Sequence, residues 1–282
     1  MRKQILVVSI FCLTLTTSLY AQDFGAGGQD QQFQGFDLQG FNDDGGKAWD
    51  VKGDSADVQG GGQIKLNNVN ANSYDEAGQR QVNVTAETGY INQASGNMRL
   101  EKDVIITSEK GTQLLTESLD WSRDEDLVLT EDEVFITDDG LAVTGSGMQA
   151  RPGLNNAEIK KDVRVTVDPK VHGSDAEKVT ITSDGPMTID QGKGVAVFVD
   201  NVVAVQEGRI LKADRMEVYF DQEMQTVKEL ICIGNVELTQ GENQTYAEKA
   251  IYNAIEQRLV LSGSPKLIMV TEGEGAITST GN

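Results

Sequence analysis

Histidine occurs once in the 282 residues, as His172, and cysteine twice, as Cys12 and Cys232. His172 lies in a turn that also contains Pro and Gly, so no Ser-His-Asp or Cys-His arrangement can be assembled from this chain. Loss of an N-terminal signal would leave Cys232 alone, which excludes an internal disulfide. The fold must therefore be held by sheet hydrogen bonds and burial, and Cys232 is expected to be a buried strand residue.

Basic and aromatic residues are also scarce. The chain has 24 lysines and arginines against 44 acidic residues, a net charge of -20, and aromatic residues make up 6%. Without a basic stripe, nucleic-acid binding is excluded. A polysaccharide-binding protein, which needs aromatic platforms, is disfavoured.

The 44 acidic residues include runs such as 124–126 and 131–133, but none has the loop spacing of a calcium site. An acid and base pair of a glycosidase cannot be excluded by counting, yet nothing marks one. We therefore predict no catalytic residues, no metal site, no cofactor and no enzymatic activity.

The N-terminus has the pattern of an export signal. Met1-Arg2-Lys3 precedes an apolar stretch that ends at Leu19, and Ala21 is a plausible cleavage site. That stretch is shorter than the roughly 20 residues of a spanning helix. Residues 1–21 are thus predicted to be a signal peptide or a membrane anchor, and the Gly- and Gln-rich residues 22–47 a linker.

A repeated motif dominates the rest of the chain. An acidic or amide residue precedes a valine five times, at Val104, Val134, Val163, Val202 and Val236, in steps of 29 to 39 residues. An earlier copy ends at Val69, and Ser264-Pro265 stands where a seventh would fall. Small residues recur 18 positions before several of these marks, namely Ala86, Thr116, Gly145 and Ala247. Such regular spacing indicates one supersecondary unit copied along the chain.

Within a unit, apolar residues recur at every second position, as at Met98, Leu100, Val104 and Ile106. Period two is typical of strands with one buried face. Charged breaks such as 101–103 separate the two halves of each unit and suit turns or strand crossings. Stacked units would form an elongated antiparallel sheet system.

Two places need separate interpretation. Ala247 to Leu261 has the composition and spacing of an amphipathic helix, but its alignment with the other units favours strand. The connection from Asp168 to Ser174, with its Pro and Gly, is the best candidate for a boundary between two modules.

The order of these motifs resembles a known pair of families. Residues similar to the periplasmic LptC family of lipopolysaccharide export are 48–53 (AWDVKG), 64–71 (IKLNNVNA), Tyr74, 100–107 (LEKDVIIT) and 111–117 (GTQLLTE). Residues similar to its relative LptA, the OstA-like fold, are 181–184 (ITSD), 200–202 (DNV), 211–214 (LKAD), 234–236 (GNV), 247–252 (AEKAIY) and 261–265 (LSGSP). Asp200 departs from the glycine expected before Asn201-Val202.

The resemblance implies an all-β fold, an elongated, twisted, V-shaped β-jellyroll in two consecutive modules, 48–168 (LptC-like) and 174–282 (LptA/OstA-like). It further implies a periplasmic protein that shields the acyl chains of lipopolysaccharide and bridges the inner-membrane ABC transporter toward the outer membrane. The first 21 residues would then be a possible inner-membrane anchor. Implied partners are lipopolysaccharide, that transporter complex, and other OstA-like β-jellyrolls joined by edge-strand addition.

The candidate residues of a lipid groove lie at period-two positions around the repeated valines. They are Val104, Ile106, Leu127, Leu129, Val134, Ile136, Val163, Val165, Val202, Val205, Val236 and Leu238. Each could equally be ordinary core between two sheets. The alternative function is a structural or surface β-solenoid that binds no lipid; a tightly filled interior would favour it, whereas small inward residues such as Ala157 and Ala204 favour a groove.

Overall fold

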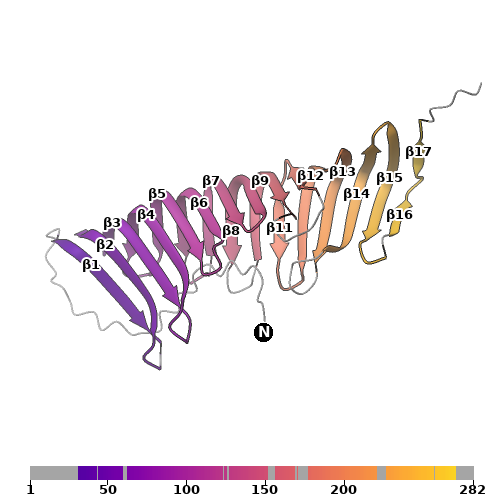
Figure 1. Ribbon diagram of the computed structural model, residues 1–282. Coiled ribbons are helices and arrows are strands. Elements are labelled where there is room, and N and C mark those ends of the chain that lie inside the picture. Colours follow the sequence, from indigo (N-terminus) through magenta and orange to yellow (C-terminus); the bar gives the residue numbers. More distant parts are fainter. Residues whose placement is uncertain are drawn as a thin grey trace, which may run out of the picture.

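A single antiparallel sheet of 17 strands forms the protein in the computed structural model (Figure 1). The structure describes residues 31–42, 44–59, 62–122, 124–125, 127–151, 156–168, 170, 177–220, 227–256 and 258–270. The predicted signal peptide or anchor at 1–21, the linker residues 22–30, and most of the predicted connection between modules lie outside the described residues.

The strands occupy most of these ranges. They are β1 (Gln31–Phe41), β2 (Lys47–Gln59), β3 (Gln63–Tyr74), β4 (Arg80–Asn92), β5 (Met98–Ser108), β6 (Gln113–Ser122), β7 (Leu127–Asp138), β8 (Leu141–Arg151), β9 (Asn156–Val167), β10 (Val179–Ser183), β11 (Met187–Asp190), β12 (Val195–Gln206), β13 (Arg209–Phe220), β14 (Val227–Gln240), β15 (Asn243–Asn253), β16 (Arg258–Ser262) and β17 (Lys266–Ile268).

Strands that follow one another in the chain lie side by side. Successive strands pair antiparallel from β1 to β9 and again from β12 to β15. At the join, β10 and β11 each pair with both β9 and β12, and at the far end β16 and β17 both pair with β15. The result is the long, twisted array of Figure 1, which confirms the predicted all-β, elongated architecture.

The repeated motif marks a bend in the middle of every second strand, in β3, β5, β7, β9, β12 and β14. The residue before the motif valine has a positive φ at Asn68 (53°), Asp103 (51°), Asp162 (55°), Asn201 (48°) and Asn235 (45°). Asn and Asp are the side chains that tolerate this left-handed conformation best. Pairing registers shift at the same places, as between Glu101 and Val104. The breaks expected to be turns or crossings therefore bend continuous strands instead of reversing the chain.

Two details of the repeat follow from this bend. Glu133, the one glutamate in the series, is not among the residues with positive φ, and Gly147 on the neighbouring strand has φ 68° instead. At the position of the seventh motif, Ser264 has φ 54° and lies between β16 and β17, which pair with successive parts of β15. The predicted seventh unit is thus present as a split strand.

Each motif valine faces a small residue on the next strand. The cross-strand partners are Val69–Ala86, Val104–Thr116, Val134–Gly145, Val163–Ser183, Val202–Ala213 and Val236–Ala247. A Cβ built on Gly145 would come within 2.4 Å of Ile159 Cγ2, so the inner side of the bend has no room for two large side chains. Packing at the bend explains why the spacing of small residues repeats along the sequence.

The linker prediction is wrong for residues 31–41. These residues form β1, which pairs with β2 from Gln31–Val58 to Phe41–Lys47. Low complexity does not prevent strand formation here because the backbone of β2 supplies a template. Side chains contribute as well: Phe36 and Leu38 are half-buried against the core cluster, and buried Gly40 packs on the indole of Trp49.

The other two uncertain segments are strands in one continuous sheet. Ala247 lies in β15 and Leu261 in β16, so the strand interpretation of this segment is confirmed against the helical one. Across the predicted module boundary, Val163 pairs with Ser183 and Ile159 with Met187. Backbone hydrogen bonding therefore continues from the first predicted module into the second.

One charged group is buried near the N-terminal end of the sheet. Asp50, 2% exposed, accepts hydrogen bonds from Lys47 Nζ at 2.6 Å, Tyr74 Oη at 2.7 Å and Asn72 Nδ2 at 2.8 Å. Burial by itself would raise the pKa of Asp50, but the hydrogen bonds together outweigh it and hold the pKa below its ordinary value. The Lys47 ammonium also lies 4.3 Å from the centre of the Tyr74 ring. This cluster ties β2 to β3.

The bend can be tested at Asp162, whose φ is 55°. Asp162→Gly should leave the free energy of unfolding unchanged or raise it, because glycine adopts this φ without strain. Asp162→Val should lower it by roughly 1–2 kcal/mol, the cost of a left-handed residue with a Cβ branch. Urea denaturation of both variants measures the difference, and equal stabilities would contradict a conformational role for this position.

The Asp50 cluster predicts a pH-dependent difference. Asp50→Asn should cost about 2 kcal/mol at pH 7, because a charge-assisted network is lost. The folded pKa is depressed, so the carboxylate stabilises fully above the ordinary Asp pKa of about 4 and loses that contribution as pH falls below it. Urea denaturation should show a smaller difference in the free energy of unfolding between wild type and Asp50→Asn at pH 3 than at pH 7. Asp57→Asn, on the same strand, is the matched control; a gap that does not change with pH would refute the assignment.

Candidate functional site

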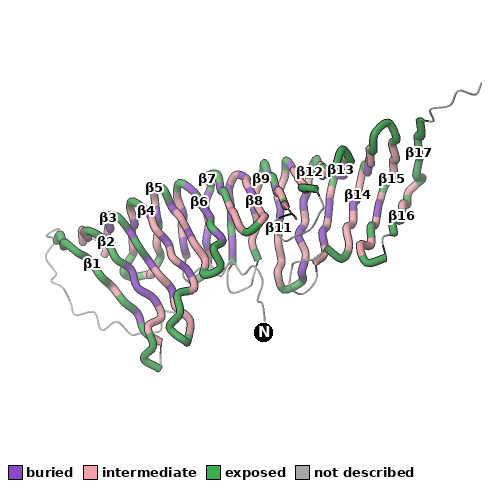
Figure 2. Tube along the Cα trace, in the orientation of Figure 1, coloured by how far each residue is buried: buried purple, intermediate pink, exposed green. Residues whose placement is uncertain are grey.

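The bends divide the sheet into two wings. We call the half-strands that run from the motif valines, such as Val104, Val163 and Val236, together with the half-strands paired to them, the valine wing. The halves on the other side of each bend form the opposite wing. Alternate side chains of both wings are buried in one continuous apolar cluster that extends from Trp49 to Ala250, as the purple stripes along the strands in Figure 2 show. The space between the wings is the candidate functional site.

The two wings are joined at a fixed spacing. In five strands, the last inward residue of the opposite wing precedes the motif valine by four positions, and all ten side chains are buried. The pairs are Leu100–Val104, Thr130–Val134, Ile159–Val163, Phe198–Val202 and Cys232–Val236. An even spacing keeps both residues on the same face of the bent strand, so each of these five strands sends its apolar side chains to the interior.

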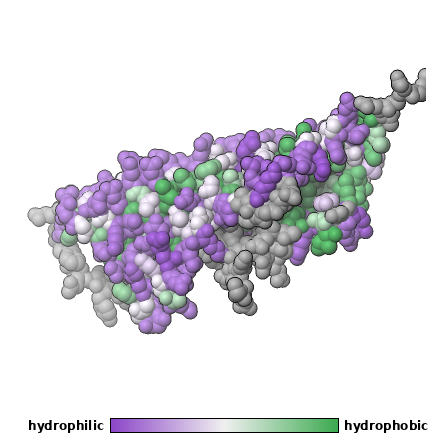
Figure 3. Space-filling model, in the orientation of Figure 1, coloured by the Kyte–Doolittle hydropathy of each residue, from purple (hydrophilic) through white to green (hydrophobic). Residues whose placement is uncertain are grey.

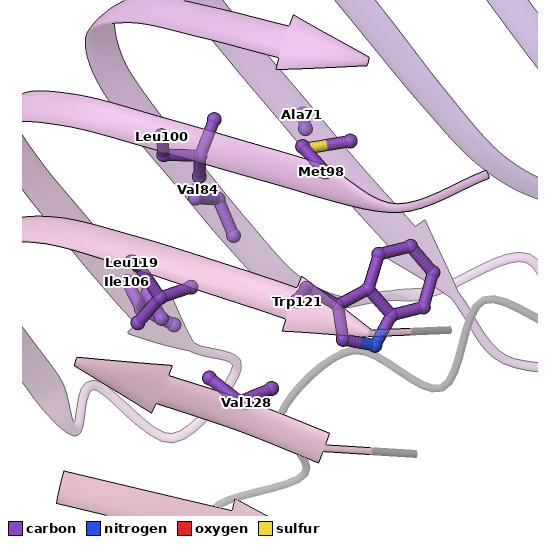
Figure 4. A pocket seen from close by; sticks show the side chains of 8 residues that line it. All are labelled: Ala71, Val84, Met98, Leu100, Ile106, Leu119, Trp121 and Val128. Atoms are coloured by element: carbon purple, nitrogen blue, oxygen red, sulfur yellow. The ribbon is translucent and has the colours of Figure 1, made fainter. Parts of the chain in front are cut away.

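The interior is closely packed in the N-terminal half. A wholly apolar cavity of about 30 Å³ lies between the wings there. Its lining comes from the valine wing, with Ala71, Val84 and Ile106, and from the opposite wing, with Met98, Leu100, Leu119, Trp121 and Val128 (Figure 4). That volume matches roughly one water molecule, so a larger apolar guest could enter only if the wings moved apart.

Toward the C-terminus the inward side chains are less covered. Leu211, Phe220, Leu230 and Leu261 pack against the core cluster but are only half-buried. In Figure 3 apolar residues reach the surface along the middle of the visible face and near β13–β15, where the face is hollowed. The apolar interior is therefore more accessible in this half than around β3–β7.

Most residues predicted for the groove do point into the interior. Seven of them are buried: Val104, Ile106, Val134, Val163, Val165, Val202 and Val236. Ile136 is half-buried against the same cluster, and Leu238 is half-buried two residues beyond Val236. The structure thus brings nine of the twelve predicted residues to one surface.

The predicted orientation is wrong for Leu127, Leu129 and Val205. Val128, between the two leucines, is 1% exposed, so Leu127 and Leu129 face outward. Val205 is 40% exposed, and Ala204 takes the inward position instead. Hydrophobicity alone gave the wrong residues for the inner face here, because an outward leucine or valine is also common in strands.

Several interior residues were missed, among them Val128, Phe198 and Met216, which is fully buried. A signal for the first two exists in the sequence. The four-residue step from Leu100 to Val104 repeats as Thr130 to Val134 and Phe198 to Val202. In these strands, stepping back four residues from the motif valine and then two at a time gives the inward face; at Val69 the step is three, to Leu66.

The interior is chemically inert. Burial raises the pKa of the Cys232 thiol to about 12, so it stays protonated and unreactive. The buried hydroxyls of Thr116 and Thr130 lie 3.4 Å apart and satisfy each other. Within the ranges that the structure describes, no three His, Cys, Asp or Glu side chains gather in a group that could hold a metal. Such a surface can hold apolar matter.

Comparison with known families agrees with this geometry. The family described as "Lipopolysaccharide-assembly, LptC-related" matches residues 8–168, which is more than half of the chain. The chain belongs to the LptC-related family. A second family, described as "LptA/(LptD N-terminal domain) LPS transport protein", matches residues 180–281. The predicted resemblance to LptC followed by LptA is thus confirmed, in that order.

The chain also resembles a solved structure, and no curated protein was found to match it. The structure is that of LptH, described as the LptA-homologous periplasmic component of the conserved lipopolysaccharide transport device from Pseudomonas aeruginosa. Sequence identity is 14%, the match covers 48% of this chain and 100% of the LptH chain, and the TM-score is 0.38.

These families consist of transport components of the cell envelope, so this LptC-related protein is a component of lipopolysaccharide transport. Among the described residues, no helix is long and apolar enough to cross a membrane.

The orientation of the strand β12 can be tested with a matched pair of substitutions. Val202→Asp should lower the free energy of unfolding by roughly 3 kcal/mol, because it buries a charge at a position with 0% exposure. Val205→Asp, on the outer face of the same strand, should cost less than about 1 kcal/mol. Thermal or urea denaturation measures both; similar losses would mean that the two valines do not lie on opposite faces.

Proposed function

We propose that this LptC-related protein carries lipopolysaccharide through the periplasm by shielding its acyl chains between the two wings of the bent sheet. Removing aliphatic chains from water gives roughly 25 cal/mol per Å² of apolar area, which is enough to hold a lipid without covalent chemistry. Inward valines, leucines and isoleucines supply a surface of that kind along the whole molecule.

The observation that carries the proposal is the continuity of this interior across the junction between the two family matches. The matches end at residue 168 and begin again at 180, yet β9 pairs with both β10 and β11. Ile159 and Val163 before the junction and Met187 after it belong to one buried cluster. A lipid could therefore pass from the LptC-like part to the LptA-like part without meeting a polar gap.

The same continuity suggests how the protein bridges membranes. In this chain the two modules are joined edge to edge, so a step that would otherwise need two proteins is built in. The LptC-like module would face the inner-membrane transporter, with residues 1–21 as signal or anchor. The LptA-like module would extend the bridge outward from the inner membrane.

The C-terminal edge is the better candidate for adding another β-jellyroll. β16 and β17 are short, and Leu259, Leu267 and Met269 are 45%, 62% and 70% exposed. A partner strand could satisfy the open backbone groups and cover these side chains at once. At the N-terminal end the outermost described strand is β1, which pairs with β2 and whose side chains are mostly polar or glycine.

The close packing of the N-terminal half indicates what lipid transport would require. A cavity of about 30 Å³ cannot accept an acyl chain, so the wings must separate around β3–β7 when lipid enters. The bends are the natural hinges, since the motif strands β3, β5, β9, β12 and β14 each place one or two residues with positive φ there. A filled interior that never opens would instead fit the alternative, a structural β-solenoid that binds no lipid.

Photocrosslinking in the native cell tests the proposal, with a photoreactive amino acid at inward Ile106, Ile136 or Val236 and immunoblotting for lipopolysaccharide. Inward positions should give lipid adducts. Their outward neighbours Ile105 and Phe135 are the matched controls and should give none, because they lie on the other face of the same strands. Adducts at neither set, with the protein folded and exported, would favour the structural solenoid.

A further inference from the structure

A trough of about 490 Å³ lies on the outer surface, across β5 to β9 beside their bends. Its floor is formed by four side chains that are neighbours across successive strands. Ile105 pairs with Leu115, Leu115 with Phe135, and Phe135 with Thr144. All four alternate with the buried residues of the interior, so they face the opposite direction.

The floor is apolar although it faces solvent. Leu115 is 36% exposed and Phe135 44%. Single exposed apolar residues are normal, but three adjacent ones in a hollow mark an interaction surface more often. The patch is limited by polar side chains, since Thr85 pairs with Ile105 on one side and Thr144 with Phe135 on the other.

The rim of the trough is acidic. Asp103, Glu117, Glu133 and Asp162 line it, and all four are exposed. None of them forms an ion pair with any residue that the structure describes. Lys161 and Arg164 stand near Asp162 on β9, so the negative charge is concentrated over β5 to β7.

Some acidic residues on the outer face elsewhere in the sheet do have cation partners. Glu101 pairs with Arg99 at 2.7 Å and Glu217 with Arg215 at 2.8 Å. Lys212 lies 3.4 Å from Glu237. The carboxylates around the trough have no such partner among the described residues, so they remain available to a cation from outside.

We propose that the trough is a docking site for a segment of a partner protein that presents a bulky apolar side chain flanked by lysine or arginine residues. The apolar side chain would cover Leu115 and Phe135, and the cations would meet Glu117 and Glu133. Opposite charges around an apolar centre give both specificity and fast association. A second copy of this chain, with net charge -20, and an anionic lipid would both be repelled by the rim.

The test uses the full chain and a fluorescein-labelled synthetic peptide in which one phenylalanine and two leucines are interspersed with four lysines. Binding is measured by fluorescence anisotropy at physiological ionic strength. The variants Glu117→Lys/Glu133→Lys and Phe135→Thr should each weaken binding at least tenfold. Threonine keeps the strand propensity of position 135, and a urea midpoint close to that of wild type verifies that each variant is folded.

Two controls distinguish docking in the trough from general electrostatic attraction between peptide and protein. Glu76→Lys/Glu242→Lys changes the net charge equally at exposed sites away from the trough, and should leave the affinity within about twofold. A peptide with glutamate in place of lysine should not bind. Equal weakening by both charge-reversed proteins, or unchanged binding to Phe135→Thr, would overturn the proposal. Self-association of the wild type that Glu117→Lys/Glu133→Lys abolishes would assign the trough to a second copy instead, and would also overturn it.

Discussion

The left-handed residue at the bend of the motif strands β3, β5, β9, β12 and β14 is the constraint on which the rest of this structure depends. Asn or Asp adopts it at positions such as 68, 162 and 235, and the valine that follows is buried each time. One bend alone would only kink a hairpin. Repeated in register along neighbouring strands, the bends fold one sheet into two wings and create an interior without a second sheet.

Packing at the bend explains both the closure and the possible opening of that interior. A small residue opposite every motif valine lets the backbones approach, and Gly145 has no space for even a Cβ. Farther from the bend, side chains such as Phe220 and Leu230 are only half-buried. Packing between the wings is thus tightest at the bend and loosest at their tips, which is the arrangement needed for an interior that opens on one side.

Charge is distributed differently on the two faces. The interior has a protonated thiol and paired hydroxyls, so nothing in it competes with an apolar guest. Outward-facing carboxylates outnumber the cations and give the net charge of -20; some, such as Glu101, form ion pairs, whereas those around the trough of β5–β9 form none with the described residues. Asp50 is the one carboxylate among the buried residues, and three hydrogen bonds keep it ionised.

The sequence by itself determined the fold class, the repeat and the place of each bend, because period-two apolar residues and an Asn or Asp before a valine are local signals. It also placed nine of twelve groove candidates on one face. Only the tertiary structure decided that Leu127, Leu129 and Val205 face outward and that residues 31–41 form a strand. The face of the sheet to which a side chain points depends on the register across a bend. The formation of β1 depends on the open edge of β2, with which it pairs. Ile105, Leu115 and Phe135 belong to different strands and meet only when the sheet forms, so the trough has no signal in any single stretch of the chain.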